Sequence, residues 1–255
     1  MTTGETTNDR TVWTLTGKDA LSFLQGLVSN DLRPLEAGPG IVWAALLTPQ
    51  GKYLADFFVV RRKDGLLLID IATCLAADTL RRLTMYRLRA DVQIVASGLH
   101  VLRGLGEPPE DALPDPRHSA LGWRAWTATP GAAPGIDWDQ IRVEHLIPES
   151  GIELVPDESY ILEQGFERLH GVDFRKGCYV GQEVTARMKH KTELRKGLSR
   201  VIVQGAAPVG SEILSDGRAI GQLYTQSGGR GIAYLRFDKS DASMSAGSAT
   251  LVLDK

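Results

Sequence analysis

The sequence predicts an α+β protein in which a mixed core of strands and helices is followed by a small C-terminal antiparallel β-barrel. Up to about residue 170, strand-like and helix-like hydrophobic patterns alternate, which is typical of sheets covered by helices. From Arg200 onward, short apolar runs recur between Gly, Ser and Asp residues, and this spacing favours a barrel. A chain of 255 residues, 43% of them hydrophobic, is long enough to bury a substantial core.

The elements of the core follow from the hydrophobic period and from the turn residues between them. Strands are expected over residues 11–16, 41–47, 53–60, 66–71, 91–96, 100–104 and 123–127. Helices are expected from residue 18 to about residue 28 and over residues 75–86, 138–146 and 160–169. The Pro-, Gly- and Ala-rich stretch between residues 106 and 135 predicts an irregular surface excursion around its one short strand.

The second part of the chain is expected to form a separate domain. Its short strands are expected over residues 201–203, 212–214, 219–226, 231–237 and 250–253. The predicted division is a core over residues 1–191, with room for two interleaved subdomains, and a barrel over residues 192–255.

Composition narrows the class of protein and the compartment. The net charge of −2 argues against an obligate nucleic-acid surface, and no apolar run approaches the roughly 20 residues that a membrane-spanning helix needs. The first ten residues are polar, which argues against a secretory signal. Cys74 and Cys178 are the only cysteines, too few for a disulfide framework, so a reducing compartment is indicated. We therefore expect a cytoplasmic protein with neither a membrane nor a nucleic-acid partner.

The most informative segment places a thiol, two glycines, an amide and a carboxylate within eight residues. Its members are Lys176, Gly177, Cys178, Tyr179, Val180, Gly181, Gln182 and Glu183, and Arg187 and Lys189 follow. Closely spaced glycines permit positive φ angles or a near approach of the backbone to a ligand, and adjacent cations favour a thiolate. The alternative is a tight turn in which Cys178 is a small buried hydrophobic residue and the cations form an ordinary solvated surface.

Three chemical roles for Cys178 stay open on the residues alone: a nucleophile, a ligand of a metal or cluster, and a partner in disulfide exchange. A self-contained zinc or iron–sulfur site is not expected, because the sequence has no second cysteine at ligand spacing. No resident metal is therefore predicted.

The eight-residue segment, with Arg187 four residues after Glu183, resembles the signature of the YgfZ-type proteins. These are folate-binding relatives of the glycine-cleavage T-protein (aminomethyltransferase) that act in iron–sulfur protein maintenance. Residues 23–31 and 46–56 resemble two further family segments, and the run 142–148 resembles a third. The similarity extends in order from about residue 11 to residue 191, most of the chain.

The resemblance implies a T-protein-like core that holds tetrahydrofolate centrally, followed by the barrel. It implies iron–sulfur client or assembly proteins as partners, which could share a cluster through Cys178, and clients that include tRNA-modifying enzymes. Glu144 is the expected reader of the amino-pyrimidine edge of the pterin, because a carboxylate accepts two hydrogen bonds side by side. The expected partners of folate carboxylates are the cations Lys176, Arg187, Lys189 and Lys191. Arg142, two residues before Glu144, is a further expected cofactor-binding residue, and Gln182 and Glu183 are expected to orient the thiol loop.

One departure from the T-protein pattern bears on catalysis. T-protein relatives carry an aspartate on the helix after the central strand, whereas this sequence places Ala77 at that position and Asp78 one residue later. A shift of one residue rotates a helical side chain by about 100°. We therefore expect an accessory protein rather than an enzyme. A folate-dependent aminomethyl or methyl transferase that uses Asp78, and a redox-sensing thiol switch without folate, remain as alternatives.

Overall fold

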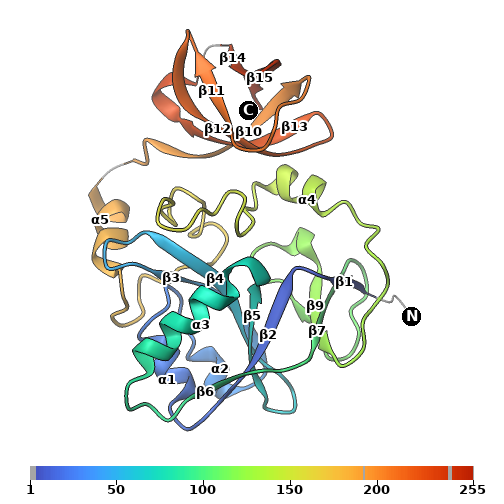
Figure 1. Cartoon of the computed structure of the whole chain (residues 1–255), viewed down its shortest axis with the longest axis vertical. Helices are drawn as coiled ribbons and strands as arrows, with labels where there is room; N and C mark the ends of the chain where they lie inside the picture. Colours follow the sequence, from blue (N-terminus) through green and yellow to red (C-terminus); the bar gives the residue numbers. More distant parts are fainter. Residues whose placement is uncertain (1–3, 192, 241–242, 255) are drawn as a thin grey trace.

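The computed structural model describes residues 4–191, 193–240 and 243–254. In Figure 1 the core lies below and the C-terminal barrel lies above it, with helix α4 and a run of turns between them. The predicted α+β class and the closed antiparallel barrel are both confirmed. The expected boundary at residue 192 lies outside the described residues, and the division into two domains stays a prediction.

The larger sheet of the core has the strand order β3-β4-β5-β2-β6 and is antiparallel throughout. Its strands are β2 (Arg10–Thr16), β3 (Gly40–Leu47), β4 (Tyr53–Arg61), β5 (Leu67–Ala72) and β6 (Gln93–Ala96). Helices α1 (Ala20–Gln25), α2 (Pro34–Ala37) and α3 (Thr73–Arg87) share one apolar cluster with this sheet. Strand β4 is buried along nearly its whole length, and its one buried carboxylate, Asp56, accepts hydrogen bonds from Trp43 and Tyr53.

A second sheet has the order β1-β7-β9-β8 and packs beside the first. It consists of β1 (Glu5–Thr7), β7 (His100–Gly104), β8 (Leu113–Pro114) and β9 (Trp123–Thr127), with the 3-10 turn η1 (Ser119–Leu121) before β9. The expected irregular surface excursion is wrong in part, because this region carries the buried side chains of Asp115, Arg117 and Arg124. Charged residues there pair with one another and are thereby stabilised in the interior.

The segment between the second sheet and the barrel differs from the sequence-based expectation at two places. Helix α4 (Trp138–His145) is where it was predicted, but the expected helix over residues 160–169 is a series of turns. Gly165 and His170 have positive φ angles of 79° and 57°, which an α-helix cannot contain. Helix α5 (Gln182–Lys191) begins directly after Gly181. The sequence patterns did not predict this helix.

The barrel closes in the order β10-β13-β12-β11-β14-β15 around a separate apolar core. Its strands are β10 (Lys196–Gln204), β11 (Ser211–Ser215), β12 (Arg218–Ser227), β13 (Arg230–Arg236), β14 (Met244–Ala246) and β15 (Ala249–Leu253). Strand β14 was not predicted, since three residues are too few for a pattern. Helix α4 packs against β12 and β13 and so joins the barrel to the core. Among the described residues, no helix has the length and apolarity needed to span a membrane.

Candidate functional site

The loop that precedes Cys178 is fixed to helix α1 by the buried side chain of Lys176. The ammonium group of Lys176 donates hydrogen bonds to the carbonyl oxygens of Gln25 (2.7 Å), the last residue of α1, and of Val28 (2.5 Å), three residues further along the chain. Carbonyl groups at the C-terminus of a helix lack partners within the helix, so a lysine is a suitable cap. Burial lowers the pKa of Lys176 to about 8, while Asp31 and Asp173 oppose this shift.

The two glycines of the thiol segment have different roles. Gly181 has a φ of 84°, and an added Cβ there would lie 2.5 Å from the carbonyl oxygen of Thr48 in the β3–β4 turn. Only glycine fits this position without strain. Gly177 has no positive φ, and nothing lies within 4 Å of where its Cβ would be. The segment is therefore held on one side by Lys176 and on the other by Gly181.

Cys178 is exposed between these two fixed points, and its neighbour Tyr179 is buried. The alternative of a buried hydrophobic cysteine in a tight turn is thus excluded for Cys178. Cys74, the second free thiol, lies on α3 and is also exposed. A pocket of about 390 Å³ opens beside the loop and is lined by Asn30, Glu167, His170, Val172, Asp173, Phe174 and Arg175.

The remaining members of the segment start helix α5. Gln182 and Glu183 form its first turn, where a carboxylate interacts favourably with the helix dipole. Arg187 is exposed one turn later. The ammonium group of Lys189 lies 2.5 Å from the carboxylate of Glu167, so it is paired within the chain.

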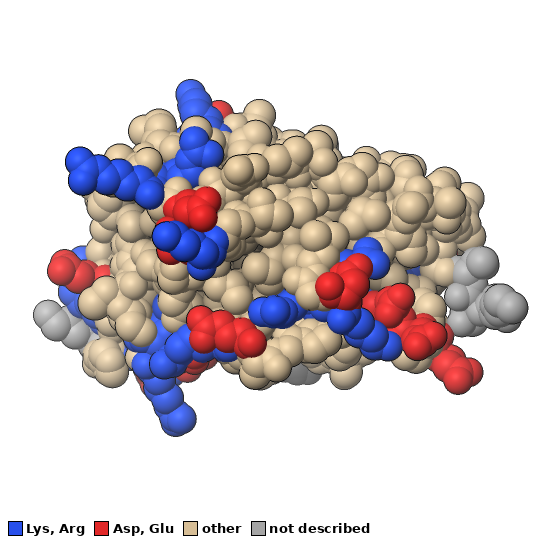
Figure 2. Space-filling model, turned by 90° about the horizontal axis from the view of Figure 1, so that it is seen from below, with Lys and Arg blue, Asp and Glu red and all other residues tan. Residues whose placement is uncertain are grey.

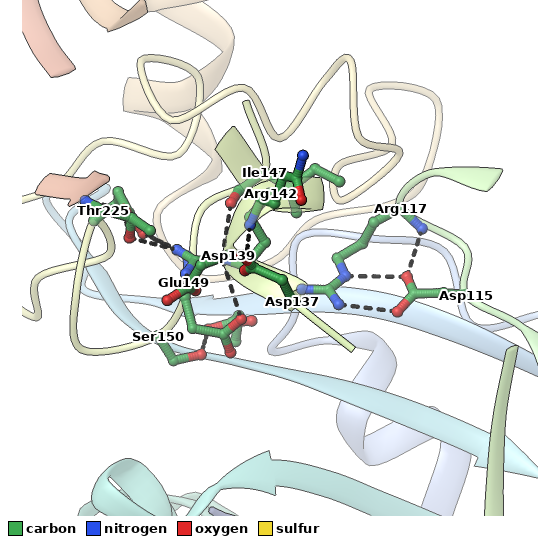
Figure 3. Close-up of polar contacts among 12 residues, drawn as sticks. Asp115, Arg117, Asp137, Asp139, Arg142, Ile147, Glu149, Ser150 and Thr225 are labelled. Atoms are coloured by element: carbon green, nitrogen blue, oxygen red, sulfur yellow. Dashed lines mark hydrogen bonds and ion pairs between the residues drawn. The ribbon is translucent and has the colours of Figure 1, made fainter. Parts of the chain in front are cut away.

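Arg142 and Glu144 are two residues apart on α4 but lie in different environments. Arg142 is 3% exposed and forms ion pairs with Asp139 (2.7 Å) and Glu153 (2.5 Å); it also bonds Thr225 Oγ1 on β12 (3.2 Å) (Figure 3). Glu144 is exposed and pairs with two arginines of the barrel, Arg200 (3.3 Å) and Arg230 (3.4 Å). The structure therefore does not bring Arg142, Glu144 and Lys189 together in one site.

A cluster of buried arginines in the centre of the core was missed from the sequence. Three guanidinium groups lie over the ring of Phe58, those of Arg124 at 4.1 Å, Arg117 at 5.0 Å and Arg10 at 5.5 Å from its centroid. Asp70 pairs with Arg10 and Arg124, and Asp115 pairs with Arg117 and Arg124 (Figure 3 shows the Asp115–Arg117 pair). Burial acts to raise the pKa of Asp115, but Arg117 and Arg124 outweigh it and hold that pKa well below its usual range.

Arg103 is the member of this region whose charge is least compensated. Its Nε is buried and has no hydrogen-bond partner among the described residues, and its guanidinium stacks on the ring of Trp138 at 4.2 Å. Burial, followed by the neighbouring charge of Arg124, lowers the pKa of Arg103 to about 10. Glu149 is the carboxylate whose charge most opposes this lowering of the Arg103 pKa. Burial acts to raise the pKa of Glu149 itself, but the charges of Arg142, Arg117, Arg10 and Arg103 outweigh burial and lower that pKa.

A signal for this cluster does exist in the sequence. Arg124 and Trp126 alternate with apolar residues in a short strand, so both lie on one face of it. Both donate to Asp70, although Arg124 does so at 3.4 Å and Trp126 at 3.3 Å. A charged residue in an inward position of an apolar strand indicates a buried ion pair.

Asp78 does not join the buried carboxylates. Its side chain is 77% exposed and pairs with Arg81 one turn along α3. Among the described residues, no group of three or more His, Cys, Asp or Glu side chains is arranged to hold a metal ion.

Comparison with known proteins finds a matching barrel domain and several sequence relatives. The model of the CAF17 C-terminal beta-barrel domain matches residues 195–255. The IBA57 homolog of Mycosarcoma maydis, named a mitochondrial iron–sulfur cluster assembly factor, is 32% identical over 73% of this chain and 54% of its own length. Human IBA57, named likewise, is 29% identical over 90% of this chain and 76% of its own length. The tRNA-modifying protein YgfZ of Vibrio vulnificus is 25% identical over 90% of this chain and 79% of its own length.

The fold itself is shared with a solved enzyme. The glycine cleavage system aminomethyltransferase T of Bartonella henselae superposes with a TM-score of 0.73 over 98% of this chain and 84% of its own length, at 14% identity. This chain spans about half the length of the fungal relative and about three quarters of the human one.

The names of the relatives correct the expected location. The fungal, mouse and human proteins are all named as mitochondrial, so the expectation of a cytoplasmic protein is wrong. Free thiols indicate only a reducing compartment, and that criterion does not separate the cytoplasm from other reducing compartments. Together, these comparisons show that the chain is similar in sequence to the IBA57 and YgfZ proteins, carries a barrel like the CAF17 C-terminal domain, and shares the fold of an aminomethyltransferase T.

Proposed function

We propose that this protein supports the assembly or maintenance of iron–sulfur proteins and meets a partner through Cys178. The observation that carries the proposal is the exposure of Cys178 within a segment that is otherwise fixed, with Lys176 and Tyr179 buried on either side. Relatives from a fungus, mouse and human are named iron–sulfur cluster assembly factors, which supports the same role.

The chemistry of one thiol limits what Cys178 can do. Iron–sulfur clusters are generally held by four thiolates, and the thiol segment supplies one. A partner must then provide the other ligands, so the cluster is a shared cargo rather than a resident cofactor. A rigid loop that presents an exposed thiol suits such a transient contact, because little conformational freedom is lost on binding.

Complementation of a deletion strain tests this role. Cys178→Ala and Cys178→Ser are expected to remain folded and abundant but to leave iron–sulfur enzymes inactive. Cys74→Ala is the matched control, since it removes the other exposed thiol, and it is expected to restore activity like the wild type. Full restoration by Cys178→Ala would contradict the proposal.

We further propose that tetrahydrofolate binds in the core beside the arginine cluster. Folates carry carboxylates, and the unpaired guanidinium edge of Arg103 fits such a group, because Arg pairs with carboxylates through charge-assisted hydrogen bonds. Arg142 and Lys189 are already paired within the chain, so Arg103 is the better candidate for the carboxylates. The assignment of Glu144 to the pterin would require its release from Arg200 and Arg230.

Calorimetric titration with tetrahydrofolate distinguishes these assignments. We expect Arg103→Met, which keeps an unbranched apolar side chain but removes the guanidinium group, to weaken binding about tenfold or more, and Cys178→Ala to leave it unchanged. Glu144→Ala tests the pterin assignment in the same series. If only Glu144→Ala weakens binding, the folate site lies at Glu144 on α4 and not at Arg103. If the wild type does not bind tetrahydrofolate, folate is removed from the proposal, and the role of Cys178 is unaffected.

Among the clients, we propose iron–sulfur enzymes that modify tRNA. The support is the name of the Vibrio vulnificus relative, a tRNA-modifying protein. Mass spectrometry of tRNA nucleosides from the deletion strain should then show the loss of modifications that depend on such enzymes, and their recovery with the wild-type chain. Unchanged modification levels would restrict the clients to other iron–sulfur proteins.

A further inference from the structure

The C-terminal end of α3 exposes apolar side chains among arginines. Met85, Tyr86 and Leu88 have 68%, 37% and 89% of their surface exposed. Residues 79–90 contain four arginines and no carboxylate, although the whole chain has a net charge of −2. We define the α3 tip as these seven residues, which are Arg81, Arg82, Met85, Tyr86, Arg87, Leu88 and Arg89.

The backbone of Leu88 is strained, and packing of its side chain within the described structure does not compensate for that strain. It has φ 42° and ψ −103°, a backbone conformation that an L-residue with a Cβ rarely adopts. Its side chain is almost fully exposed and so gains almost nothing from packing within the described structure. A strained backbone that holds a leucine in solvent points to a contact with another molecule, because exposure of a single large apolar residue brings no stability by itself.

The charged residues of the α3 tip indicate the chemistry of that molecule. All four cations are arginines. The planar guanidinium group of arginine can donate two parallel hydrogen bonds to one carboxylate, whereas the ammonium group of lysine lacks this geometry. Arg81 pairs with Asp78, and Arg87 donates to a backbone carbonyl. Arg82 and Arg89 have no polar partner among the described residues. Two arginine side chains are therefore free to bind carboxylates from outside.

The exposed apolar residues of the α3 tip indicate that its partner is a protein rather than another kind of anionic molecule. Tyr, Met and Arg are the residue types enriched at protein interfaces, where an apolar centre is surrounded by polar groups. Exposed Met85 and Leu88 would add little to the binding of a nucleic-acid backbone, which is recognised through its phosphates.

We propose that the α3 tip docks a protein partner that presents carboxylates around an apolar side chain. In Figure 1 the end of α3 and strand β6 lie at the bottom of the core, on the side away from the barrel. The face seen from below carries more Lys and Arg on one side, with Asp and Glu among them, and leaves a broad area without charged side chains (Figure 2). The α3 tip shares no residue with the segment around Cys178, and the proposal does not depend on the role of that thiol.

Fluorescence anisotropy with the full chain tests the proposal, using a short labelled peptide of Glu and Leu residues as the probe. We expect the peptide to bind the wild type, and binding to weaken about tenfold or more in Arg82→Gln/Arg89→Gln and in Met85→Ser/Leu88→Ser. The control Val209→Ser/Val252→Ser changes two exposed apolar residues of the barrel and should bind like the wild type. A peptide with Lys in place of Glu should not bind.

Leu88→Gly provides the sharpest variant, because it separates docking from folding. Glycine tolerates the backbone angles of this position, so the Tm should stay the same or rise while peptide binding falls. A lower Tm would mean that Leu88 supports the fold and would overturn the inference. Equal peptide affinity in all variants, or no binding at all, would also overturn it. Binding of the α3 tip to vesicles with phosphatidylglycerol, or to single-stranded RNA, in place of the peptide would show a different class of partner and equally refute it.

Discussion

The ammonium group of Lys176 lies 2.7 Å from the carbonyl oxygen of Gln25, which joins residues 151 positions apart in the sequence. This contact ties the loop before Cys178 to the end of helix α1. The thiol is thereby held at a defined place on the surface of the core, although the loop itself has no regular secondary structure. The lysine next to the thiol serves as a structural anchor rather than as a free surface cation.

Lys176→Met should loosen this anchor. Two carbonyl groups, one of them on the fully buried Val28, lose a charged donor, and we expect the free energy of unfolding to fall by about 1.5–3 kcal/mol. Urea denaturation measures the loss, and the rate of Cys178 modification by a thiol reagent should change as the loop gains freedom. Arg175→Met, next to it but exposed, is the control and should alter neither quantity. An unchanged stability in Lys176→Met would show that the two hydrogen bonds are dispensable.

The two glycines of the thiol segment should respond differently to alanine. Gly181→Ala forces a positive φ on a residue with a Cβ and places that atom against the Thr48 carbonyl, which should cost about 1–3 kcal/mol or more. Gly177→Ala meets open space and should change stability by less than about 0.5 kcal/mol. Thermal and chemical denaturation of the two variants give the comparison, and equal losses would refute the distinction.

Glu153 should be important for the attachment of the barrel to the core. Its carboxylate is 0% exposed, pairs with Arg142 and accepts hydrogen bonds from the hydroxyl and backbone N–H of Thr225 on β12. Glu153→Gln leaves a buried guanidinium with weaker compensation, so a loss of about 3–5 kcal/mol is expected in denaturant titrations.

A matched control uses an exposed acidic partner of the same arginine, which also pairs with Glu149 at 3.5 Å. Asp139 is 58% exposed, and Asp139→Asn should cost less than about 1 kcal/mol. The double change Arg142→Met/Glu153→Met should recover part of the stability lost in Glu153→Gln, because it removes both buried charges together. A double variant less stable than Glu153→Gln would contradict this account.

Stability should fall in mild acid through His118. Its ring stacks on His145 with centroids 4.2 Å apart, and burial, then His145 and Arg168, lower its pKa, while Asp115 opposes them. Because the folded-state pKa lies below the unfolded value of about 6.5, the unfolded chain binds the proton first as the pH falls. The free energy of unfolding should therefore decrease as the pH drops through about 6.5.

His118→Asn separates this titration from the structural role of the ring. Asparagine can still accept the hydrogen bond that Ala120 N–H donates to His118 Nδ1, but it does not titrate. The loss of stability between neutral and mildly acidic pH should be smaller in this variant than in the wild type. His100→Asn, on the exposed part of β7, should keep the wild-type slope. Identical slopes in all three proteins would show that His118 does not control the acid response.

Local patterns predicted most elements of the core. The strand expected over residues 53–60 is the buried strand β4, although it contains the charged residue Asp56, and the turn over residues 48–51 joins it to β3. The helix over residues 160–169 failed because an apolar period does not reveal that Gly165 and His170 take left-handed angles. Helix α5 was missed because its start, at Gln182, coincides with the end of a glycine-containing turn.

The sequence by itself determined the α+β class, the barrel, the resemblance to the YgfZ-type proteins and the thiol segment, because each depends on residues that are neighbours along the chain. Only the tertiary structure decided which charged residues are buried. Arg10, Arg117 and Arg124 come from a strand, a loop and another strand, yet their guanidinium groups meet over Phe58. Arg142 and Glu144 are two residues apart on α4, yet one is buried in ion pairs and the other faces the arginines of the barrel. Ion pairing in the interior depends on contacts between distant segments, and these contacts exist only once the sheets, turns and barrel have packed together.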